Sequence, residues 1–146
     1  MFSRSAEYAI RAMTFLAAQP PGKLSGAREI SQAENIPMPF LWKILNNLTR
    51  LKMIRSFKGV RGGYELARRA QEITVSDIIQ ATDNIHVVQN CVLGLAECNE
   101  ANPCPLHPLW KEIKTKLADM LEENTLADMA VVVQRRELAR KLDRSQ

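Results

Sequence analysis

The stretch that decides the fold is AREISQAENIPMPFLWKILNNLTRLKMIRSFKGVRGGYEL, residues 27–66. Its first part predicts a short helix, a tight turn at Asn35-Ile36-Pro37 and a second helix over about 39–52. Apolar residues recur in this second helix at the spacing of one buried face, at Leu41, Ile44, Leu45 and Leu48. Two helices joined by a tight turn are typical of a helix-turn-helix.

The second part of this stretch predicts a β-hairpin. Strand-forming residues 53–57 and 63–66 flank a tip that is rich in glycine and positive charge. Glycine lets the backbone turn tightly and approach a phosphate chain closely. Lys58 and Arg61 at the tip are placed to neutralise phosphates or to enter a narrow minor groove. A hairpin directly after a helix-turn-helix indicates a wing, with an ordinary charged hairpin as the alternative.

Helices are also predicted on both sides of this stretch. Residues 4–18 have helical apolar spacing and end at a Pro-Pro-Gly turn. Ser25 is the expected N-cap of the helix that precedes the tight turn. Thr74 and Asp77 have the spacing of a capping box and predict a helix that extends to about residue 82.

A long helix is predicted from about residue 105. Its apolar face consists of Leu109, Trp110, Ile113, Leu117, Met120 and Leu121. The apolar face of a single helix has to be covered by another part of a protein. We therefore interpret this helix as the dimerisation helix of a homodimer, with packing on its own domain as the alternative. Thr125 and Asp128 have the same capping-box spacing as Thr74 and Asp77. They predict a last helix that frays into the charged tail 135–146.

The predicted fold class is mainly α with a small β-hairpin wing, that is, a winged helix-turn-helix plus a long dimerisation helix. The expected segments are a winged helix-turn-helix DNA-binding domain (1–82), a cysteine-bearing loop (83–104), the dimerisation helix (105–124) and a C-terminal helix with a charged tail (125–146). Residues 1–82 carry 12 Lys/Arg and 6 Asp/Glu, whereas residues 83–146 carry 8 and 10. This asymmetry favours nucleic acid as the partner of the first domain. No apolar run approaches the ~20 residues that cross a bilayer, and no signal-peptide pattern is present, so we expect a cytoplasmic protein without membrane contact.

All three cysteines lie in one polar loop with the spacing C-x6-C-x5-C-x2-H, formed by Cys91, Cys98, Cys104 and His107. Reduced thiols in the cytoplasm are more typical of metal or redox sites than of disulfides. Buried structural thiols, a regulatory disulfide and a Cys3His zinc site are alternatives. The zinc alternative lacks the close cysteine pair that structural zinc usually has. Widely spaced thiolates favour an iron–sulfur cluster, because a cluster is larger than one ion.

Several motifs, in the same order, resemble those of bacterial winged-helix regulators that include IscR, NsrR, RirA and the cluster-free CymR. The motifs are SAEYAIRAM, AREISQAENIP, GVRGGYEL, ITVSDIIQAT, CPLHPLW and NTLADM. The resemblance covers nearly the whole chain. It implies a homodimeric transcriptional repressor that binds a palindromic DNA operator and whose affinity is controlled by a [2Fe-2S] or [4Fe-4S] cluster.

The resemblance also implies particular cluster ligands. Cys91, Cys98 and Cys104 match the cysteine ligands, and His107 matches the fourth ligand of the IscR branch. The rival fourth ligand is a carboxylate from the other subunit, as in the NsrR branch, and Glu7 occupies that position. Six residues separate the first two cysteines here, against five in IscR, which leaves the cluster type open.

DNA binding through the second helix of the motif and the wing is a further implication of the resemblance. At positions 39, 42 and 43 of this helix, the IscR branch has a small polar residue, an acid and an amide, and this chain has other residue types. The operator sequence of the IscR branch is therefore not expected to apply to this chain. Lys43 is a candidate for a guanine contact, whereas Trp42 is expected to pack. The candidate DNA-contacting residues are Pro39, Trp42, Lys43, Asn46, Asn47, Arg50, Lys58 and Arg61.

Two other functions were weighed against this one. A cluster-free or zinc-binding, thiol-responsive regulator would share the fold and differ only at the cysteine loop. An enzyme is not expected, because the chain has no Ser/His/Asp or HExxH arrangement, and His86 and His107 are its only histidines.

Overall fold

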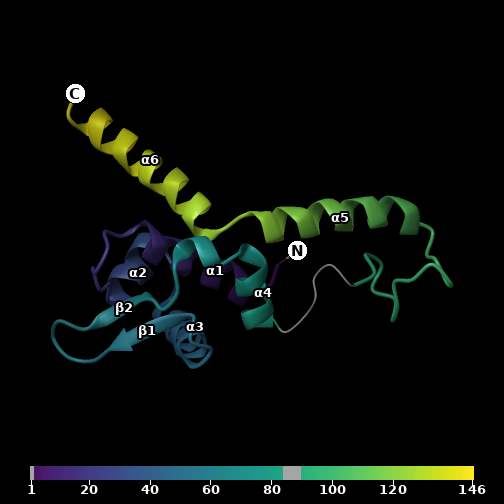
Figure 1. Cartoon of the computed structure of the whole chain (residues 1–146), viewed down its shortest axis with the longest axis horizontal. Coiled ribbons are helices and arrows are strands. Elements are labelled where there is room, and N and C mark those ends of the chain that lie inside the picture. The colour runs from purple at the N-terminus through teal and green to yellow at the C-terminus, as the bar shows by residue number, and fades with distance from the viewer. Residues whose placement is uncertain (1, 84–89) are drawn as a thin grey trace.

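A computed structural model describes residues 2–83 and 90–146 (Figure 1). The elements are α1 (Arg4–Ala18), α2 (Ala27–Glu34), α3 (Met38–Arg50), β1 (Ile54–Phe57), β2 (Gly63–Leu66), the short 3-10 helix η1 (Ala70–Glu72), α4 (Val75–Asp83), α5 (His107–Glu123) and α6 (Leu126–Arg144). These helices and the single hairpin confirm the predicted fold class. Within the described ranges, no helix has the length and apolar character needed to span a bilayer.

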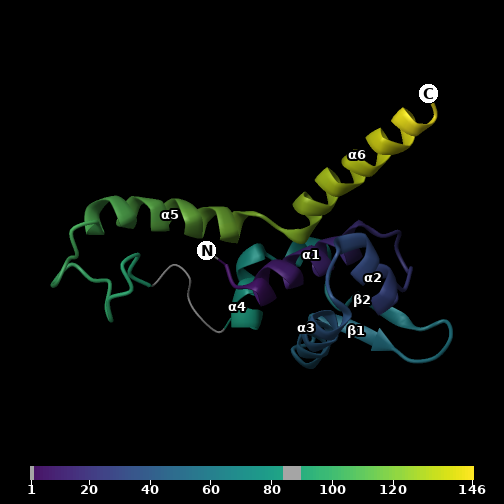
Figure 2. The same cartoon turned by 180° about the vertical axis from the view of Figure 1, so that it is seen from behind.

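Residues 2–83 and α6 form the part that we call the body. Helix α1 is its central element and contacts α2, α3, α4, α6 and β2 (Figures 1 and 2). The side chains of Ala9, Ala12 and Met13 on α1 are fully buried. Small residues let neighbouring helices approach closely, so one helix can support all the others.

The helix-turn-helix consists of α2 and α3. Asn35 caps α2 in the left-handed conformation with φ of 51°, which asparagine tolerates better than most residues. Ser25 is not the N-cap that the sequence suggested, because Gly26 occupies that position without a side-chain hydrogen bond. The backbone of Ser25 instead pairs with Tyr64 of β2, at N···O distances of 3.0 and 2.8 Å. The residue therefore joins the wing to the helices.

The wing is the antiparallel hairpin β1–β2, with Ile54 opposite Leu66 and Phe57 opposite Gly63. Its tip requires glycine at position 62, since a Cβ there would lie 2.0 Å from the carbonyl oxygen of Phe57. The strand bounds agree closely with those predicted from the sequence.

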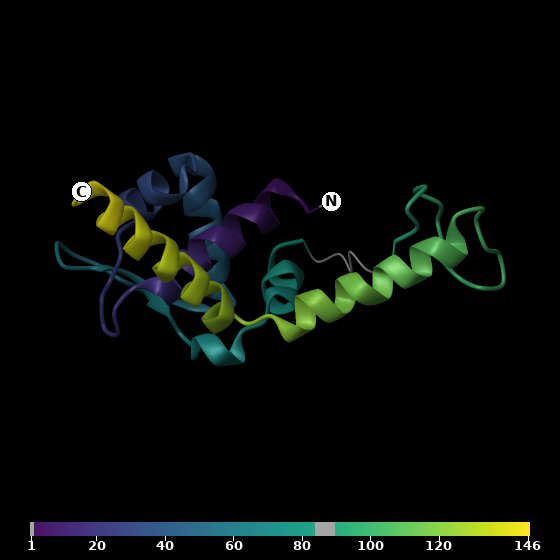
Figure 3. The same cartoon turned by 90° about the horizontal axis from the view of Figure 1, so that it is seen from above.

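Residues 90–123, which comprise the cysteine loop and α5, form a second part that we call the arm. Helix α5 extends away from the body, and the cysteine loop lies at its outer end (Figures 1 and 3). The inner end of α5 is attached through Leu121, which packs with Ala6, Val75 and Ile79. The segment between α5 and α6 adds backbone hydrogen bonds from Val75 N to Asn124 O (3.0 Å) and from Leu126 N to Ile73 O (2.9 Å).

Both predicted capping boxes are present. Thr74 and Asp77 exchange hydrogen bonds of 3.0 and 3.1 Å before α4. Thr125 and Asp128 do the same before α6. The predicted fraying of the last helix at residue 135 is wrong, because α6 continues to Arg144. Its sequence there is rich in Ala, Leu, Arg and Lys, which are strong helix formers, and Gln134 Nε2 donates to the carbonyl of Ala18 (3.1 Å).

Candidate functional site

The outer face of α3 carries most of the predicted DNA-contacting residues. Pro39, Lys43 and Asn46 are exposed. Trp42 is 55% exposed, so the packing expected for it is not found within the chain. Phe40 is equally exposed, and its ring centroid lies 6.3 Å from that of Tyr8. Sequence reasoning missed Phe40, although a Phe off the apolar stripe of an amphipathic helix was the signal.

Asn47 differs from these residues, because its amide is already bonded within the chain. The side chain is half-buried, and Nδ2 donates to the carbonyl of Ala81 at 3.2 Å. Its Oδ1 accepts from Arg50 Nη2 at 2.6 Å. The amide thus connects α3 to α4 and orients the exposed guanidinium of Arg50.

The wing presents Lys58 and Arg61 to solvent on either side of the fully exposed Val60. The salt bridges among the described residues include Arg55–Glu65 at 3.1 Å within the wing, but none involves Lys58, Arg61 or Lys43. Helix α3 and the wing lie on the same side of the body, and α6 lies on the opposite side (Figure 1). This side is suited to a polyanion.

The cysteine loop gathers its four soft donors into two pairs at the outer end of the arm. Cys98 Sγ lies 3.6 Å from His107 Nδ1, and the buried side chain of Cys104 lies close enough to Cys91 to lower the pKa of that thiol. All three cysteines are free thiols. Trp110 Nε1 donates to Asn90 O at 2.9 Å and fixes the start of the loop to α5.

Local hydrogen bonds favour the thiolate form of Cys91. Backbone N–H groups of Leu93 and Leu95 lower the pKa of Cys91, against the desolvation that raises it. The side chain of Cys104 lowers this pKa further. A thiolate is the form that ligates metals.

His107 has a buried ring nitrogen, Nε2, without a hydrogen-bond partner among the described residues. A buried polar atom without a partner costs about 1–3 kcal/mol. Within the described ranges, no three His, Cys, Asp or Glu side chains are grouped closely enough to hold one metal ion. The four donors thus lie together at the outer end of the arm without converging on one point.

The alternative fourth ligand, Glu7, lies elsewhere in the chain. Glu7 is exposed on the first turn of α1, in the body, whereas the loop lies at the outer end of the arm (Figure 1). A contact between Glu7 and the loop would therefore have to come from a second chain. His86 lies outside the described residues.

The predicted dimerisation face is only partly covered. Leu121 is buried against the body, and Trp110 and Leu117 are half-buried. Leu109 is 64% exposed and Ile113 is 53% exposed, and Met120 is also exposed. Packing on its own domain thus accounts only for the inner end of α5.

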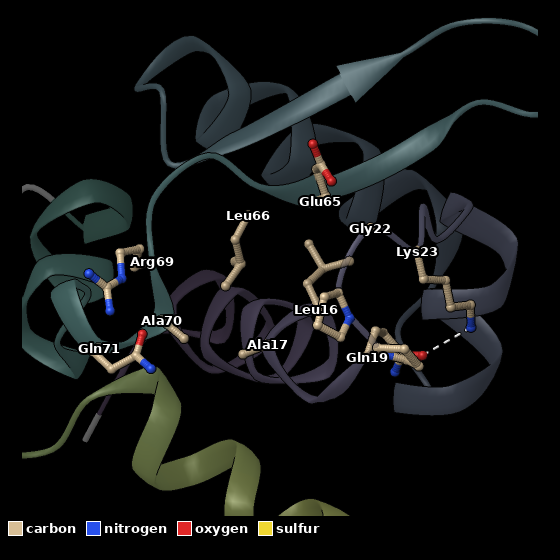
Figure 4. Close-up of a pocket in the computed structure, with 12 residues that line it drawn as sticks. Leu16, Ala17, Gln19, Gly22, Lys23, Glu65, Leu66, Arg69, Ala70 and Gln71 are labelled. Atoms are coloured by element: carbon tan, nitrogen blue, oxygen red, sulfur yellow. Dashed lines mark hydrogen bonds between the residues drawn. The ribbon is translucent and has the colours of Figure 1, made fainter.

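A cleft of about 520 Å³ lies between the C-terminal end of α1, the following loop, β2 and η1 (Figure 4). Its lining includes Leu16 and Leu66 but no His, Cys or Ser. The Lys23 ammonium at its rim is bonded to Gln19 Oε1 (2.9 Å) and Glu29 Oε1 (2.6 Å). The cleft therefore offers no nucleophile–base pair.

Comparison with known proteins identifies the family. The family described as "Rrf2: Iron-dependent Transcriptional regulator" matches residues 2–131. The chain belongs to the Rrf2 family. Met1 and the last 15 residues, 132–146, lie outside the match.

Individual Rrf2 relatives agree with this assignment. The chain is 34% identical over 131 residues to a protein of Aquifex aeolicus named "Putative HTH-type transcriptional regulator", covering 88% of this chain and 90% of that protein. It is 32% identical over 131 residues to the HTH-type transcriptional regulator NsrR of Halalkalibacterium halodurans, covering 84% and 85%. The structure of CymR, "the Global Cysteine Regulator of B. subtilis", has the same fold, with a TM-score of 0.75, 23% identity and coverage of 90% and 97%. The family description and the two sequence relatives name transcriptional regulators, which confirms the prediction of a DNA-binding regulator rather than an enzyme.

Proposed function

We propose that this Rrf2 protein is a homodimeric repressor whose operator affinity is controlled by an iron–sulfur cluster bound in the cysteine loop. The observation that carries the proposal is which residues of the arm are buried. All residues of the arm are described, and only Cys91, Cys104, His107 and Leu121 are buried. Three of these four are candidate ligands, so soft donors rather than a hydrophobic core organise the outer end of the arm.

The ligands in this proposal are Cys91, Cys98, Cys104 and His107. His107 is preferred to the partner subunit's Glu7 because His107 is buried beside Cys98 and its Nε2 has no hydrogen-bond partner in the described part of the chain. When bound, an iron–sulfur cluster supplies a redox-active centre that nitric oxide, oxygen or iron shortage removes. The chain itself favours a thiolate ligand at Cys91, because backbone N–H groups lower the pKa of this thiol.

The dimer in this proposal forms through α5. Leu109, Ile113 and Met120 expose apolar surface along a helix that extends away from its own body. A second copy would cover this face, and the two bodies would then present two α3 helices to one duplex. A symmetric dimer of helix-turn-helix domains reads a palindromic operator with half-sites about one helical turn apart. Ligation at the end of the arm would set the relative placement of the two bodies.

The second candidate is a cluster-free, thiol-responsive regulator of the same fold. The closeness of the Cys104 side chain to Cys91 favours it, since two neighbouring thiols can be oxidised to a disulfide. The fold shared with CymR is compatible with this candidate.

Anaerobic purification of the full-length protein separates the two candidates. We expect visible absorbance, with iron and acid-labile sulfide bound to each chain, and loss of these in Cys91→Ala, Cys98→Ala and Cys104→Ala. His107→Ala should alter the absorbance and electron paramagnetic resonance spectra, and Glu7→Ala should leave them unchanged. A colourless protein free of iron and sulfide would exclude cluster control, and a change in Glu7→Ala alone would exclude His107 as the fourth ligand.

A further inference from the structure

A lysine on α5 contacts one of the candidate ligands. His107, Lys111 and Lys114 are spaced i, i+4 and i+7, so they share one face of the helix. Lys114 is half-buried, and its Nζ donates to Cys98 Sγ at 3.4 Å. The same sulfur lies 3.6 Å from His107 Nδ1. Lys111 pairs with the Glu100 carboxylate, so residues 98–100 follow this face of α5.

We propose that Lys114 is a positioning residue that fixes Cys98 against α5 and raises the reduction potential of the cluster. The inference rests on the proposed cluster function and adds a control on its redox state. An ammonium that donates to a ligand sulfur withdraws negative charge from it. One-electron reduction makes the centre more negative, so the same hydrogen bond stabilises the reduced state more than the oxidised state. Hydrogen bonds to the sulfurs are among the factors that set cluster potentials.

The contact with Cys98 distinguishes Lys114 from an ordinary surface lysine. Lys116 lies two residues further along α5, about 200° around the helix, and is exposed. Among the described residues it has no hydrogen bond from its ammonium. Lys116 thus has the same charge on the same helix but lacks the sulfur, which makes it a matched control.

The experiment is a potentiometric titration of the anaerobically purified, cluster-loaded protein, followed by its absorbance. The variants are Lys114→Met, Lys114→Gln and Lys114→Arg, with Lys116→Met as the control. We expect the potential to fall most in Lys114→Met and less in Lys114→Gln, which keeps a neutral donor. Lys114→Arg and Lys116→Met should remain close to the wild-type potential.

A vibrational measurement checks the hydrogen bond itself. Exchange from H2O into D2O should shift an iron–sulfur stretching band in the resonance Raman spectrum of the wild type and Lys114→Arg. This shift should be smaller in Lys114→Met, where only hydrogen bonds from other donors, such as the backbone N–H groups at Cys91, remain. If Lys114 acts only in folding, the cluster-loaded Lys114→Met variant should show the same band shift as the wild type.

The failures of the two proposals are distinguishable. A wild type without iron and sulfide defeats the cluster function itself. A loaded wild type whose potential and D2O shift are unchanged in Lys114→Met defeats only the role of Lys114. If Lys114→Met does not retain the cluster, Lys114→Gln decides the outcome. A reduction potential of Lys114→Gln equal to that of Lys114→Arg would overturn the inference, because the charge at position 114 would then have no effect on the cluster.

Discussion

The body and the arm bury their apolar residues very differently. In the body, large side chains such as Met13, Ile30 and Leu45 are fully buried, and one continuous core joins α1, α2, α3 and the wing. In the arm, Leu109 and Ile113 face solvent, and the buried residues are chiefly the candidate ligands. The helix-turn-helix and the wing therefore share a core within one chain, whereas the outer end of the arm has no such core among the described residues.

The first prediction uses substitutions of the same kind in the two regions. Leu45→Ala in the body should reduce the free energy of unfolding by about 2–5 kcal/mol, because it leaves a cavity in a close-packed core. Leu109→Ala in the arm should have a much smaller effect at a protein concentration at which only monomers are present. Urea unfolding followed by circular dichroism measures both values. Equal losses would show that the arm also has a packed interior within one chain.

The second prediction concerns the exposed face of α5. Ile113→Glu places a charge in the proposed dimer interface and should convert the protein to a monomer. Val132→Glu is the matched control, because Val132 is similarly exposed (54%) but lies on α6 in the body. Light scattering coupled to size-exclusion chromatography gives the mass of each variant. A dimer that persists in Ile113→Glu, or is lost in Val132→Glu, would place the interface elsewhere.

The third prediction concerns the charged side of the body. Lys58→Ala should weaken binding to a duplex selected by the wild-type protein from a random pool, and should reduce the slope of log affinity against log salt by about 1. Lys23→Ala is the control, because Lys23 lies away from the wing tip and pairs with Glu29. Fluorescence anisotropy over a series of salt concentrations measures both slopes. An unchanged slope for Lys58→Ala would remove the wing tip from the DNA interface.

The body could be predicted from the sequence almost element by element, since local signals decide it. Leu41, Ile44, Leu45 and Leu48 mark the inner face of α3, and all four are buried. The capping residues Thr74 and Thr125 mark the starts of α4 and α6. The errors arose where a distant contact competes with a local signal. Ser25 is a good N-cap by type, but its backbone pairs with β2, 39 residues further along the chain.

The candidate site was predictable in composition but not in arrangement. The spacing of Cys91, Cys98 and Cys104 indicates soft ligands, yet spacing does not say which donors form pairs. The pairing of Cys98 with His107 depends on how the loop folds back on α5. The approach of Lys114 to Cys98 has the same origin, because 16 residues separate them in sequence and only the folded loop brings them together. The hydrogen bond from Asn47 to Ala81 likewise depends on tertiary packing.

The smallest predicted effect concerns the junction where the arm joins the body. Hydrogen bonds from the Thr125 backbone N–H and hydroxyl lower the pKa of Asp128 below its unfolded value of about 3.9. A lowered folded-state pKa means that the ionised carboxylate stabilises the fold above pH 3.9, and that this contribution is lost as the pH falls through the folded-state pKa. Asp128→Asn should therefore lower the Tm slightly at pH 7 and leave it nearly unchanged at pH 2.

The matched control for this prediction is Asp119→Asn, an exposed residue of α5 outside the capping box. Its Tm should follow that of the wild type at both pH values when measured by circular dichroism. Helix α6 starts at this box and packs along α1, so a loosened start would affect the body more than the arm. A loss in Asp128→Asn that is as large at pH 2 as at pH 7 would mean that the box acts through packing rather than through the charge of Asp128.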